Sequence, residues 1–550
     1  MTAITPLLSG RQTRRGGLAA IFALLFATIL SQAVAAIPLQ TPGNFDPLFA
    51  GGLGKIANLP IGAGNDQANA VALQPDGKIV MAGACSTGGP GKDFCLARLN
   101  ANGSLDASFT GPGALASGKF MLPMGQADNT AYALALQPDG KIIVAGACHS
   151  GVNYDFCIAR LNPNGSLDSS FGGPGGAGNG LFLLPMGSSH DFATAVSLQP
   201  DGKILLAGSC YNVSDYDFCV ARLNVDGTLD ATFVGPAGNG IGKFLLPIST
   251  VGTKDDFLAA MALQGDGKIV LAGNCVASGN IKQFCVARLN PDGSLDTNFD
   301  GPGATPGDGK FLLTMGAINN VATALLVQPD GNIVLTGSCS ATASTVDFCA
   351  ARLLPGNGAL DLSFIGPAGS GDGRFSFPIG VVLNLLRSAA IQSDGKLILA
   401  GECGLTGLYY FCTARLNGDG SFDSTFDGPS GNANGKMLLS VGTGNNQARA
   451  VAIQPDGKIV VVGYCGDGVN DDFCVARLSG GPFGNKSCTM DIDGDGKLQA
   501  LTDGLMITRV MLGMTGNAVT AGALGVGATR TTWTAIRDYL VTQCGMTVLP

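Results

Sequence analysis

Short apolar stretches separated by turn residues run through most of the chain. One unit contains four of them, at Gly118–Met124, Ala131–Gln137, Lys141–Ala147 and Asp155–Leu161. Apolar stretches of this length bounded by Gly, Asp and Pro predict β-strands. The string LQPDGKIVMAGAC at Leu73–Cys85 returns in recognisable form six more times at intervals of 62 to 65 residues, so the strands belong to a sevenfold repeat.

The second and third strands of each unit are joined by an Asp-Gly pair, which proline precedes in five units. Proline presets the first turn position and glycine accepts positive φ, so this pattern predicts a tight hairpin. The aspartates of the seven pairs are Asp76, Asp139, Asp201, Asp266, Asp330, Asp394 and Asp456.

Four strands in about 63 residues suit one blade of a β-propeller, whereas the coils of a β-helix are much shorter. We therefore predict an all-β fold, a seven-bladed β-propeller of four-stranded units, followed by a small α-helical calcium-loop module at the C-terminus. The units start near residues 45, 105, 167, 229, 295, 360 and 422. An open solenoid of β-sheets is the alternative, because periodicity alone does not prove that a ring closes.

The motif L-D-x-x-F follows each of the first six units, with Phe replacing Leu in the sixth, and is missing after the seventh. A matching segment, FDPLF at Phe45–Phe49, stands before the first unit. We expect this segment to dock beside the last unit and close the ring, which would remove an exposed sheet edge. The repeated arginines, which we expect to tie the blades together by pairing with the Asp of this motif, are Arg98, Arg160, Arg222, Arg288, Arg352, Arg415 and Arg477.

Fourteen of the sixteen cysteines form pairs spaced nine or ten residues apart, at the end of the third strand and the start of the fourth. A hairpin brings such cysteines opposite each other, which predicts a disulfide worth about 2–3 kcal/mol in each unit. A zinc site is disfavoured, because the spacing is not one that zinc modules use and the chain has only two histidines. The pairs are Cys85 and Cys95, Cys148 and Cys157, Cys210 and Cys219, Cys275 and Cys285, Cys339 and Cys349, Cys403 and Cys412, and Cys465 and Cys474.

The N-terminus has the pattern of a secretory signal peptide: basic residues at 11–15, an apolar run at Leu18–Leu30 and small residues at Ala33–Ala36. We expect cleavage after Ala35 or Ala36, no transmembrane segment in the mature chain, and a secreted or cell-surface location. Residues 1–36 contain three arginines and no acid, so their removal takes the formal net charge from −8 to −11. Nucleic acid is not an expected partner for such a chain.

The predicted organisation has four parts: a signal peptide at 1–36, the propeller at 37–479, a linker at 480–487 and the C-terminal module at 488–550. Glu402 is the only glutamate, whereas glycine occurs 84 times. That composition is typical of turns and not of helix surfaces, which agrees with an all-β body.

The units share LQPDGKI, then AG, then F-x-x-A-R-L-N-x-x-G-x-L-D-x-x-F, over residues 45–479. This pattern resembles the delta-60 repeat, which is found in exported bacterial proteins and is thought to fold as β-propeller blades. The resemblance implies a fold more than a function, because that family carries no agreed enzymatic activity.

After the linker, Asp491, Asp493 and Asp495 stand at alternate positions and are followed by Gly496. Alternate carboxylates that converge on a hard cation, followed by a glycine that permits the sharp turn, are typical of an EF-hand loop. Lys497 would supply a backbone carbonyl. We expect one calcium ion here.

The acid that closes this loop is Asp503 at position 13, because position 12 is Thr502. The alternative is an Asp- and Gly-rich turn that caps the following helix through Thr502 or Asp503. The module resembles a type I dockerin, a calcium-dependent fold that attaches secreted proteins to cohesin partners. The resemblance implies a cohesin-like surface partner and the metal ligands Asp491, Asp493, Asp495, Lys497 and Asp503.

The module departs from a dockerin in its second half, Thr515–Leu549, which has no comparable acid cluster and keeps only a helix-like stretch near Trp533. The cysteines that flank the module, Cys488 and Cys544, are expected to form a disulfide in place of the second ion.

No catalytic motif stands out. His149 and His190 fall in different units, and most aspartates recur at turn or cap positions. We expect a noncatalytic binding or scaffold protein whose partner is an extracellular protein or a polysaccharide. The alternative is an extracellular polysaccharide-active enzyme, a hydrolase or a lyase, although the few aromatic residues argue against a sugar-stacking cleft.

The segments between the paired cysteines vary from unit to unit, and a propeller gathers such loops on one face. Candidate contacts there are Tyr154, Tyr211, Tyr216, Tyr409 and Tyr410. The alternative is ordinary packing of loop tyrosines.

Overall fold

The computed structural model describes most of the chain from residue 41 onward. The described ranges are 41–89, 91–112, 117–175, 178–238, 241–249, 254–277, 281–302, 307–316, 318–342, 345–380, 383–405, 407–429, 434–481, 492–495, 499, 501–511 and 514–542. The predicted signal peptide, most of the predicted linker, and Cys488 and Cys544 lie outside them.

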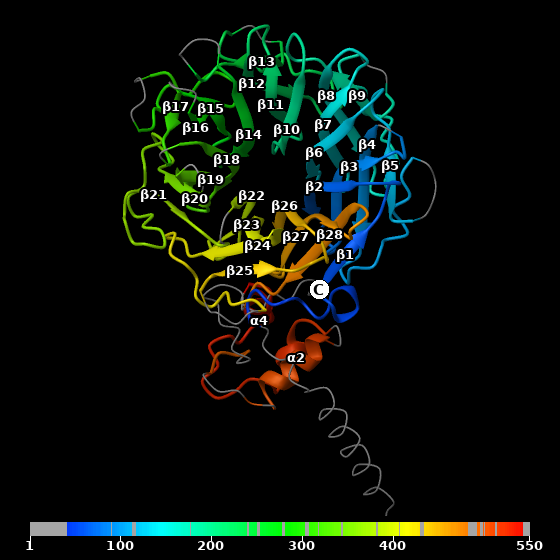
Figure 1. Ribbon diagram of the computed structural model, residues 1–550. Helices are drawn as coiled ribbons and strands as arrows, with labels where there is room; N and C mark the ends of the chain where they lie inside the picture. Colours follow the sequence, from blue (N-terminus) through cyan, green and yellow to red (C-terminus); the bar gives the residue numbers. More distant parts are fainter. Residues whose placement is uncertain are drawn as a thin grey trace, which may run out of the picture. The chain divides into compact units, whose positions relative to one another are not determined.

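Seven four-stranded antiparallel sheets stand around a common axis and form a β-propeller (Figure 1). The inner strands are β2 (Asp66–Leu73), β6 (Asn129–Leu136), β10 (Asp191–Leu198), β14 (Asp256–Leu263), β18 (Asn320–Val327), β22 (Asn384–Ile391) and β26 (Asn446–Ile453). The second strands are β3 (Ile79–Ser86), β7 (Ile142–His149), β11 (Ile204–Tyr211), β15 (Ile269–Val276), β19 (Ile333–Thr342), β23 (Leu397–Leu405) and β27 (Ile459–Gly466).

The third strands are β4 (Lys92–Leu99), β8 (Tyr154–Leu161), β12 (Tyr216–Leu223), β16 (Lys282–Leu289), β20 (Thr345–Leu353), β24 (Leu408–Leu416) and β28 (Asp471–Leu478). The outer strands are β5 (Lys119–Leu122), β9 (Leu181–Leu184), β13 (Lys243–Leu246), β17 (Lys310–Leu313), β21 (Arg374–Phe377), β25 (Lys436–Leu439) and β1 (Lys55–Leu59). Blade 1 begins with β2, and blade 7 consists of β26, β27, β28 and β1.

The four strands predicted for each unit are present, but the blade boundary is shifted along the chain. The strand at Lys119–Leu122, predicted as the first of its unit, is the outer strand of the preceding blade and pairs with β4. Periodicity defines the length of a repeat but not the point at which one sheet ends, which depends on strand pairing.

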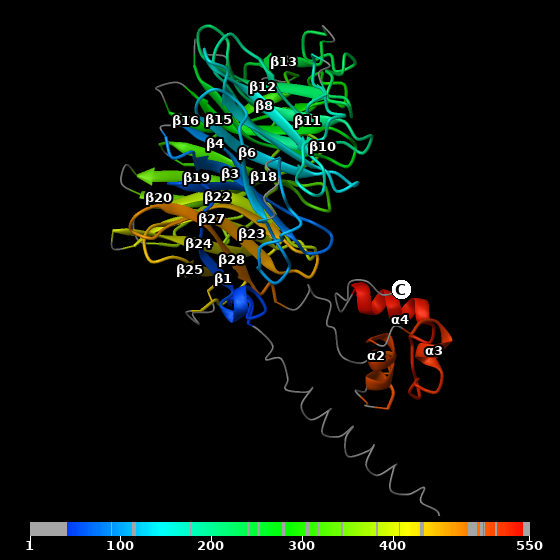
Figure 2. The same cartoon turned by 90° about the vertical axis from the view of Figure 1, so that its right-hand side faces the viewer.

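The strands run from one face of the ring to the other (Figure 2). We call the face with the loops between second and third strands, and with the connections between blades, the disulfide face. The opposite face, with the Asp-Gly turns and the L-D-x-x-F loops, is the turn face. At the first Asp-Gly turn, Gly77 has a φ of 82°, which glycine adopts without a steric penalty.

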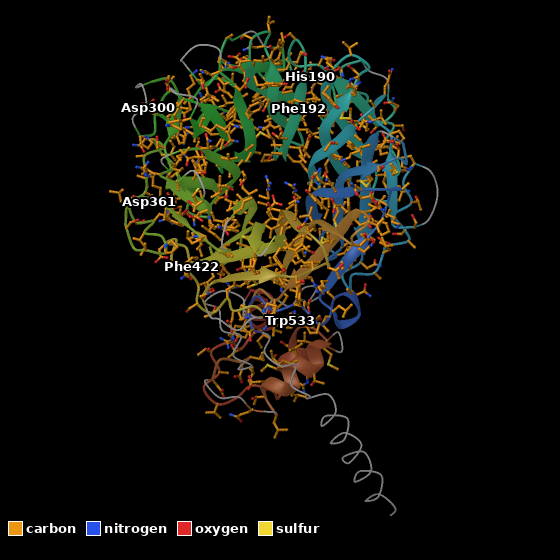
Figure 3. All side chains as sticks on the ribbon, viewed as in Figure 1. His190, Phe192, Asp300, Asp361, Phe422 and Trp533 are labelled. Carbon is orange, nitrogen blue, oxygen red and sulfur yellow. A yellow bond between two sulfur atoms is a disulfide. The ribbon has the colours of Figure 1, made fainter. Side chains whose placement is uncertain are left out.

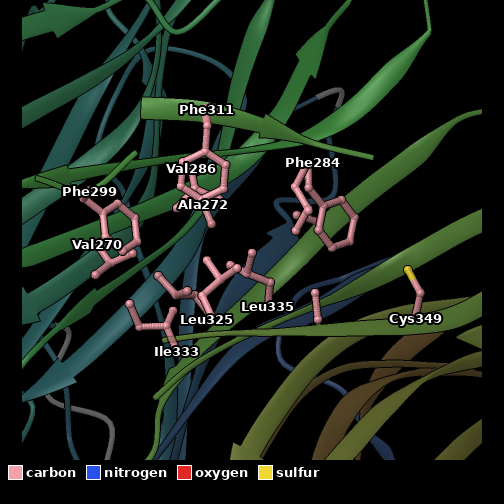
Figure 4. Close-up of a cluster of buried hydrophobic side chains, with 14 of the residues drawn as sticks. Val270, Ala272, Phe284, Val286, Phe299, Phe311, Leu325, Ile333, Leu335 and Cys349 are labelled. Atoms are coloured by element: carbon pink, nitrogen blue, oxygen red, sulfur yellow. The ribbon is translucent and has the colours of Figure 1, made fainter. Parts of the chain in front are cut away.

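The hydrophobic core lies between neighbouring blades. In one such cluster Val270 and Val286 of blade 4 pack against Ile333 and Leu335 of blade 5, with Phe311 beside them (Figure 4). The second strands are almost entirely buried, because both of their faces are covered by other blades. The core is therefore a set of seven seams around the ring.

On the turn face, a buried arginine connects each blade to the next. Arg98 Nε donates to Asp106 Oδ2 at 2.8 Å, its guanidinium lies 4.5 Å from the Phe109 ring centroid, and it also donates to the carbonyl of Pro163 in blade 2. This confirms the predicted pairing. The carbonyls that accept from the other six arginines belong in turn to Val225, Pro291, Pro355, Gly418, Gly480 and Ala101.

Hydrogen bonds keep one aspartate of these pairs, Asp168, ionised. Burial alone would raise the pKa of Asp168, but the hydroxyl and amide of Ser170, together with Lys141 and Arg160, lower it to about 2. The arginine therefore keeps its buried counter-ion over nearly the whole pH range.

The ring is closed by the N-terminal segment, as predicted, so the solenoid alternative is wrong. Strand β1 pairs with β28, and Phe45 forms a bridge with Leu478. Arg477 Nε donates to Asp46 Oδ2 at 2.8 Å, and its guanidinium lies 4.6 Å from the Phe49 ring centroid. The closing seam thus repeats the arginine contacts of the other six.

Among the described residues seven disulfides are present, one in each blade, with Cα–Cα distances of 5.7–5.9 Å. They connect the pairs that the spacing predicts. Each joins the second strand to the third next to a loop of variable sequence.

The C-terminal part contains the helices α2 (Asp503–Met511), α3 (Asn517–Thr520) and α4 (Trp533–Thr542). Its small core includes Ile492, Met506, Val519 and Ile536. The helices expected after Asp503 and near Trp533 are therefore present. No helix of the described residues is long and apolar enough to cross a membrane.

Candidate functional site

Seven aromatic side chains meet on the disulfide face of blades 2, 3 and 4, and we call them the aromatic patch. Its members are His149, Tyr154, His190, Phe192, Tyr211, Tyr216 and Phe257, and all are half-buried. Their ring centroids form a connected series with neighbour distances of 5.1–6.4 Å. Figure 3 labels two members, His190 and Phe192.

Strand ends position these rings. His149 ends β7 and Tyr154 begins β8, and the two residues pair across the hairpin. Tyr211 and Tyr216 hold the same positions in blade 3. Phe192 is the second residue of inner strand β10, which places its ring between the two hairpins, 5.7 Å from Tyr154 and 6.1 Å from Tyr216.

Backbone hydrogen bonds orient both histidines. The amide of Gly151 donates to His149 Nδ1 at 3.1 Å, and the amide of Tyr154 donates to His190 Nδ1 at 3.2 Å. An Nδ1 atom that accepts a hydrogen bond belongs to the neutral imidazole whose proton is on Nε2. Each histidine can therefore offer an Nε2–H donor to a ligand.

Buried acids lie in the same seams as the patch. Burial, with a smaller effect from the charge of Asp155, raises the pKa of Asp191 to about 6, although the amides of Met186 and Gly187 donate to it. Burial likewise raises the pKa of Asp155, against the opposing effects of Ser150 and Lys243. The proton on Asp191 therefore titrates near pH 6.

The other blades lack the patch, because different residues occupy the same positions. Gln67, Val321, Leu385 and Gln447 stand where blades 3 and 4 have Phe192 and Phe257. The hairpin of blade 1 ends in Ser86 and Lys92 where blade 3 has Tyr211 and Tyr216. The patch is therefore a local feature that the repeat itself does not require.

The structure brings three of the five candidate tyrosines together and separates the other two. Tyr154, Tyr211 and Tyr216 belong to the patch. Tyr409 and Tyr410 lie on β24 in blade 6, and within the described residues neither makes a ring contact with it.

Four members of the patch were missed by sequence reasoning. His149 and His190 fall in different repeats, so their proximity depends on the packing of adjacent blades. Phe192 and Phe257 belong to inner strands, and no sequence motif marks them. An alignment of the repeats carries a signal for them, because Phe follows the first inner-strand residue only in the third and fourth repeats.

The turn face also has a pocket, of about 430 Å³, lined by Leu48, Asp76, Asp456, Lys458 and Arg477 among others. Its aspartates and arginine recur in every blade, and its lysine recurs in all blades except blade 5, which has Asn332. We interpret it as a product of the blade-to-blade contacts.

In the C-terminal loop, the described candidate ligands are Asp493, Asp495 and Asp503, whereas Asp491 and Lys497 lie outside the described residues. Asp493 and Asp503 are both fully buried. Asp503 accepts hydrogen bonds from the amides of Ile492 (2.5 Å) and Gln499 (3.0 Å). Its carboxylate therefore closes the loop around the start of α2.

Within the part of the chain that the structure describes, no three His, Cys, Asp or Glu side chains form a group suited to a metal. Since two of the five predicted ligands are outside that part, the calcium site stays a prediction.

The ring of four-stranded sheets and its closing N-terminal strand define the class of the protein, a seven-bladed β-propeller with one disulfide per blade. Seven segments match the family model "Domain of unknown function (DUF5122) beta-propeller". The chain thus carries seven DUF5122 β-propeller repeats, the delta-60 type. The matched segments are 74–109, 137–171, 199–233, 264–299, 328–364, 392–426 and 454–480.

No curated protein matches the chain. Solved structures with a similar chain path include the polysaccharide lyase Uly1, with 12% identity and a TM-score of 0.41 over 77% of this chain and 91% of that one. A PL25 ulvan lyase bound to -[GlcA(1-4)Rha3S]- has 10% identity and a TM-score of 0.42, over 78% and 96% of the two chains. Sqt1 from Chaetomium thermophilum has 13% identity and a TM-score of 0.38, over 78% and 100%. Similarity at this level gives no evidence that this chain shares the activity of any of these proteins.

Proposed function

We propose that this protein is a secreted or cell-surface, noncatalytic binding protein that uses the aromatic patch to hold an extracellular polysaccharide. The observation that carries the proposal is the connected series of seven half-exposed rings, confined to three blades of an otherwise repetitive ring. A repeat that only had to fold would not need these rings, since blades 1, 5, 6 and 7 fold without them.

A sugar chain fits the chemistry of the patch better than an apolar protein surface does. Tyrosine and histidine present an apolar ring beside a polar tip, so they can cover the C–H face of a sugar and hydrogen-bond its hydroxyl groups. The oriented Nε2–H groups of His149 and His190 add donors of the same kind. The gathering of these rings also removes the objection that aromatic residues are too few for a sugar-stacking site.

Affinity electrophoresis of the purified full-length protein in gels that contain cell-wall or plant glycans tests this proposal. Retardation by a glycan is expected, and the double variant Tyr154→Ala, Phe192→Gln should reduce it by about tenfold or more, if a sugar on one ring gains what a nucleobase gains by stacking, ~1–3 kcal/mol. The matched control is Tyr409→Ala, which changes a tyrosine outside the patch. Equal retardation of all three proteins would reject the patch as the binding surface.

A second candidate is a polysaccharide-active enzyme. Its support is the contact of His149 and His190 with the same tyrosine, Tyr154, at ring distances of 5.2 and 5.6 Å. Imidazole and phenol groups can exchange protons with a bound substrate. Release of soluble sugar from a retained glycan, lost in His149→Ala and His190→Ala, would favour the enzyme; retention without products favours the binder.

We also propose that the C-terminal module binds one calcium ion through Asp491, Asp493, Asp495, Lys497 and Asp503 and helps to tether the protein to a cohesin-like partner. Alternate aspartates followed by glycine support this proposal. Calorimetric titration with calcium should give a heat of binding that Asp493→Ala reduces; Asp456→Ala, in an Asp-Gly turn, is the control. Indistinguishable titrations of the wild type and Asp493→Ala would contradict the site.

A further inference from the structure

A polar contact joins neighbouring blades on the disulfide face. Its positions are the first residue of an inner strand, Asn or Asp, and the residue two positions before the second cysteine of the preceding blade, which is Asp at five junctions, Gln283 at one and Tyr410 at another. Two junctions show the contact directly: Asn129 Nδ2 donates to Asp93 Oδ1 at 2.9 Å, and Asn384 Nδ2 donates to Asp347 Oδ1 at 3.1 Å.

The amide nitrogen at this position is surrounded by oxygen acceptors. Asn129 Nδ2 also donates to the carbonyl of Ala127 at 2.9 Å. Asn446 Nδ2 donates to the carbonyls of Gly444 at 2.7 Å and Tyr409 at 3.4 Å. A group that donates hydrogen bonds is therefore suited to the position, and a carboxylate oxygen is not.

At the closing seam, where β2 of blade 1 lies beside β28 of blade 7, the asparagine is replaced by Asp66 (Figure 1). Asp66 Oδ2 accepts from the amides of Ile61 at 2.6 Å and Gly62 at 2.8 Å. Its Oδ1 accepts from the amide of Ser86 at 3.3 Å, as Asn129 Oδ1 accepts from the amide of His149 at 3.2 Å. A carboxylate, which cannot donate, thus occupies the position at which asparagine donates in other blades.

The residue opposite Asp66 is Asp472, which is only 4% exposed and accepts no hydrogen bond from any residue that the structure describes. The other two junctions with paired aspartates differ in this respect. Asn212 Nδ2 donates to Asp217 at 2.6 Å, and Ser150 donates to Asp155. Asp472 is therefore the carboxylate of these pairs that lacks a donor.

The electrostatic environment of these two carboxylates favours the binding of a positive charge at this seam. Burial, and then the charges of Asp66 and Asp467, raise the pKa of Asp472. Burial also raises the pKa of Asp66. Lys119 opposes both shifts, but its ammonium donates to the carbonyl of Pro60.

We propose that a hard divalent cation of the calcium type binds between the carboxylates of Asp66 and Asp472 and locks the closing seam of the ring. The repeat equivalence adds two backbone carbonyls to the donor set. Gly64 corresponds to Ala127 and Gly444, and Asp471 corresponds to Tyr409. Calcium prefers such all-oxygen sites and completes its six to eight ligands with water.

Solvent can reach the seam. A pocket of about 330 Å³ beside it is lined by Asn65, Asn445, Gly466, Asn470 and Asp471 among others. This site uses no residue of the aromatic patch or of the C-terminal loop. A negative result for this site would therefore leave the proposed function unaffected, and the reverse also holds.

The test uses the full-length protein with Asp493→Ala, so that the C-terminal loop does not contribute. Calorimetry with calcium chloride is expected to show binding of one ion. Calcium should also raise the Tm relative to EDTA, because a ligand that binds only the folded state stabilises it.

Adding Asp472→Asn to this background should weaken calcium binding by about tenfold or more, because a charged ligand is lost. The new amide can donate to Asp66, so the variant should fold and have a higher Tm in EDTA than its parent. The matched control is Asp93→Asn, which changes the equivalent residue of the first junction and should leave calcium binding unchanged.

Two outcomes would overturn the proposal: no calcium-dependent change in Tm in the Asp493→Ala background, or identical titrations with and without Asp472→Asn. A shared proton instead of a metal would show as a gain in Tm in EDTA from Asp472→Asn that grows as the pH rises, with no response to calcium.

Discussion

The two faces of the propeller differ in how far the blades resemble one another. On the turn face, all seven seams use the same arginine, aspartate and phenylalanine, including the seam that the N-terminal segment closes. On the disulfide face, only the cysteines and the first inner-strand residue recur, and the remaining positions vary. One face therefore maintains the ring, whereas the other is free to carry a binding surface.

The difference has a physical reason. Each turn-face arginine is buried and donates to groups of two blades, so its loss removes one donor from a buried carboxylate and one from a carbonyl of the next blade. The disulfide clamps its own hairpin, so residues beyond the cysteines can change without opening a seam.

The largest effect is expected for Arg477→Ala, which leaves Asp46 buried without its partner and should lower the free energy of unfolding by about 3–5 kcal/mol. Arg222→Ala should cost a similar amount if the closing seam is equivalent to an internal one. Chemical denaturation measures both. Asp201→Ala, in an exposed turn, is the control; an Arg477→Ala protein as stable as that control would disprove closure by the N-terminal segment.

A smaller effect is expected when one disulfide is removed. The pairs Cys210→Ala with Cys219→Ala and Cys403→Ala with Cys412→Ala each open a short loop and should each cost about 2–3 kcal/mol. Only the first pair lies next to the patch, so glycan retention should fall in that variant alone. Loss of retention in both variants would mean that the patch is not what the glycan contacts.

Asp191→Asn should stabilise the protein by about 1–2 kcal/mol above pH 6, because burial raises the pKa of Asp191 to about 6 and ionisation then opposes folding. A group with a raised pKa contributes its full stability below its usual pKa near 3.8 and loses it as the pH rises through about 6. The gain should therefore vanish below about pH 4. Thermal melts from pH 4 to 8, with Asp201→Asn as control, test this; a gain that does not depend on pH would be contrary to the expectation.

The smallest effect on stability is expected for Phe192→Gln, which introduces the residue that blades 1 and 7 have at this position. The ring is half-buried and the replacement occurs naturally in the repeat, so the change should stay within about 1 kcal/mol. A much larger loss would show that the aromatic patch is part of the core and weaken its assignment as a binding surface.

The sevenfold repeat could be predicted from the sequence because the patterns that define it are local. The Asp-Gly turn specifies a hairpin within a few residues, and cysteines nine or ten apart must meet if that hairpin forms. The L-D-x-x-F motif follows six units and is missing after the seventh. The matching segment Phe45–Phe49 could therefore be predicted to complete the seventh unit. The candidate site could be predicted only in part: Tyr154, Tyr211 and Tyr216 stand in the variable segments between paired cysteines, but His190, Phe192 and Phe257 do not.

By itself, the sequence determined the number of blades, their strands, the disulfide pairs and the segment that closes the ring, because each depends on contacts repeated at a constant spacing. The tertiary structure decided where one sheet ends and the next begins, which rings meet in the aromatic patch, and which aspartates face each other between blades. These depend on contacts across seams between different repeats, and the identity of a facing residue is set by packing and not by distance along the chain.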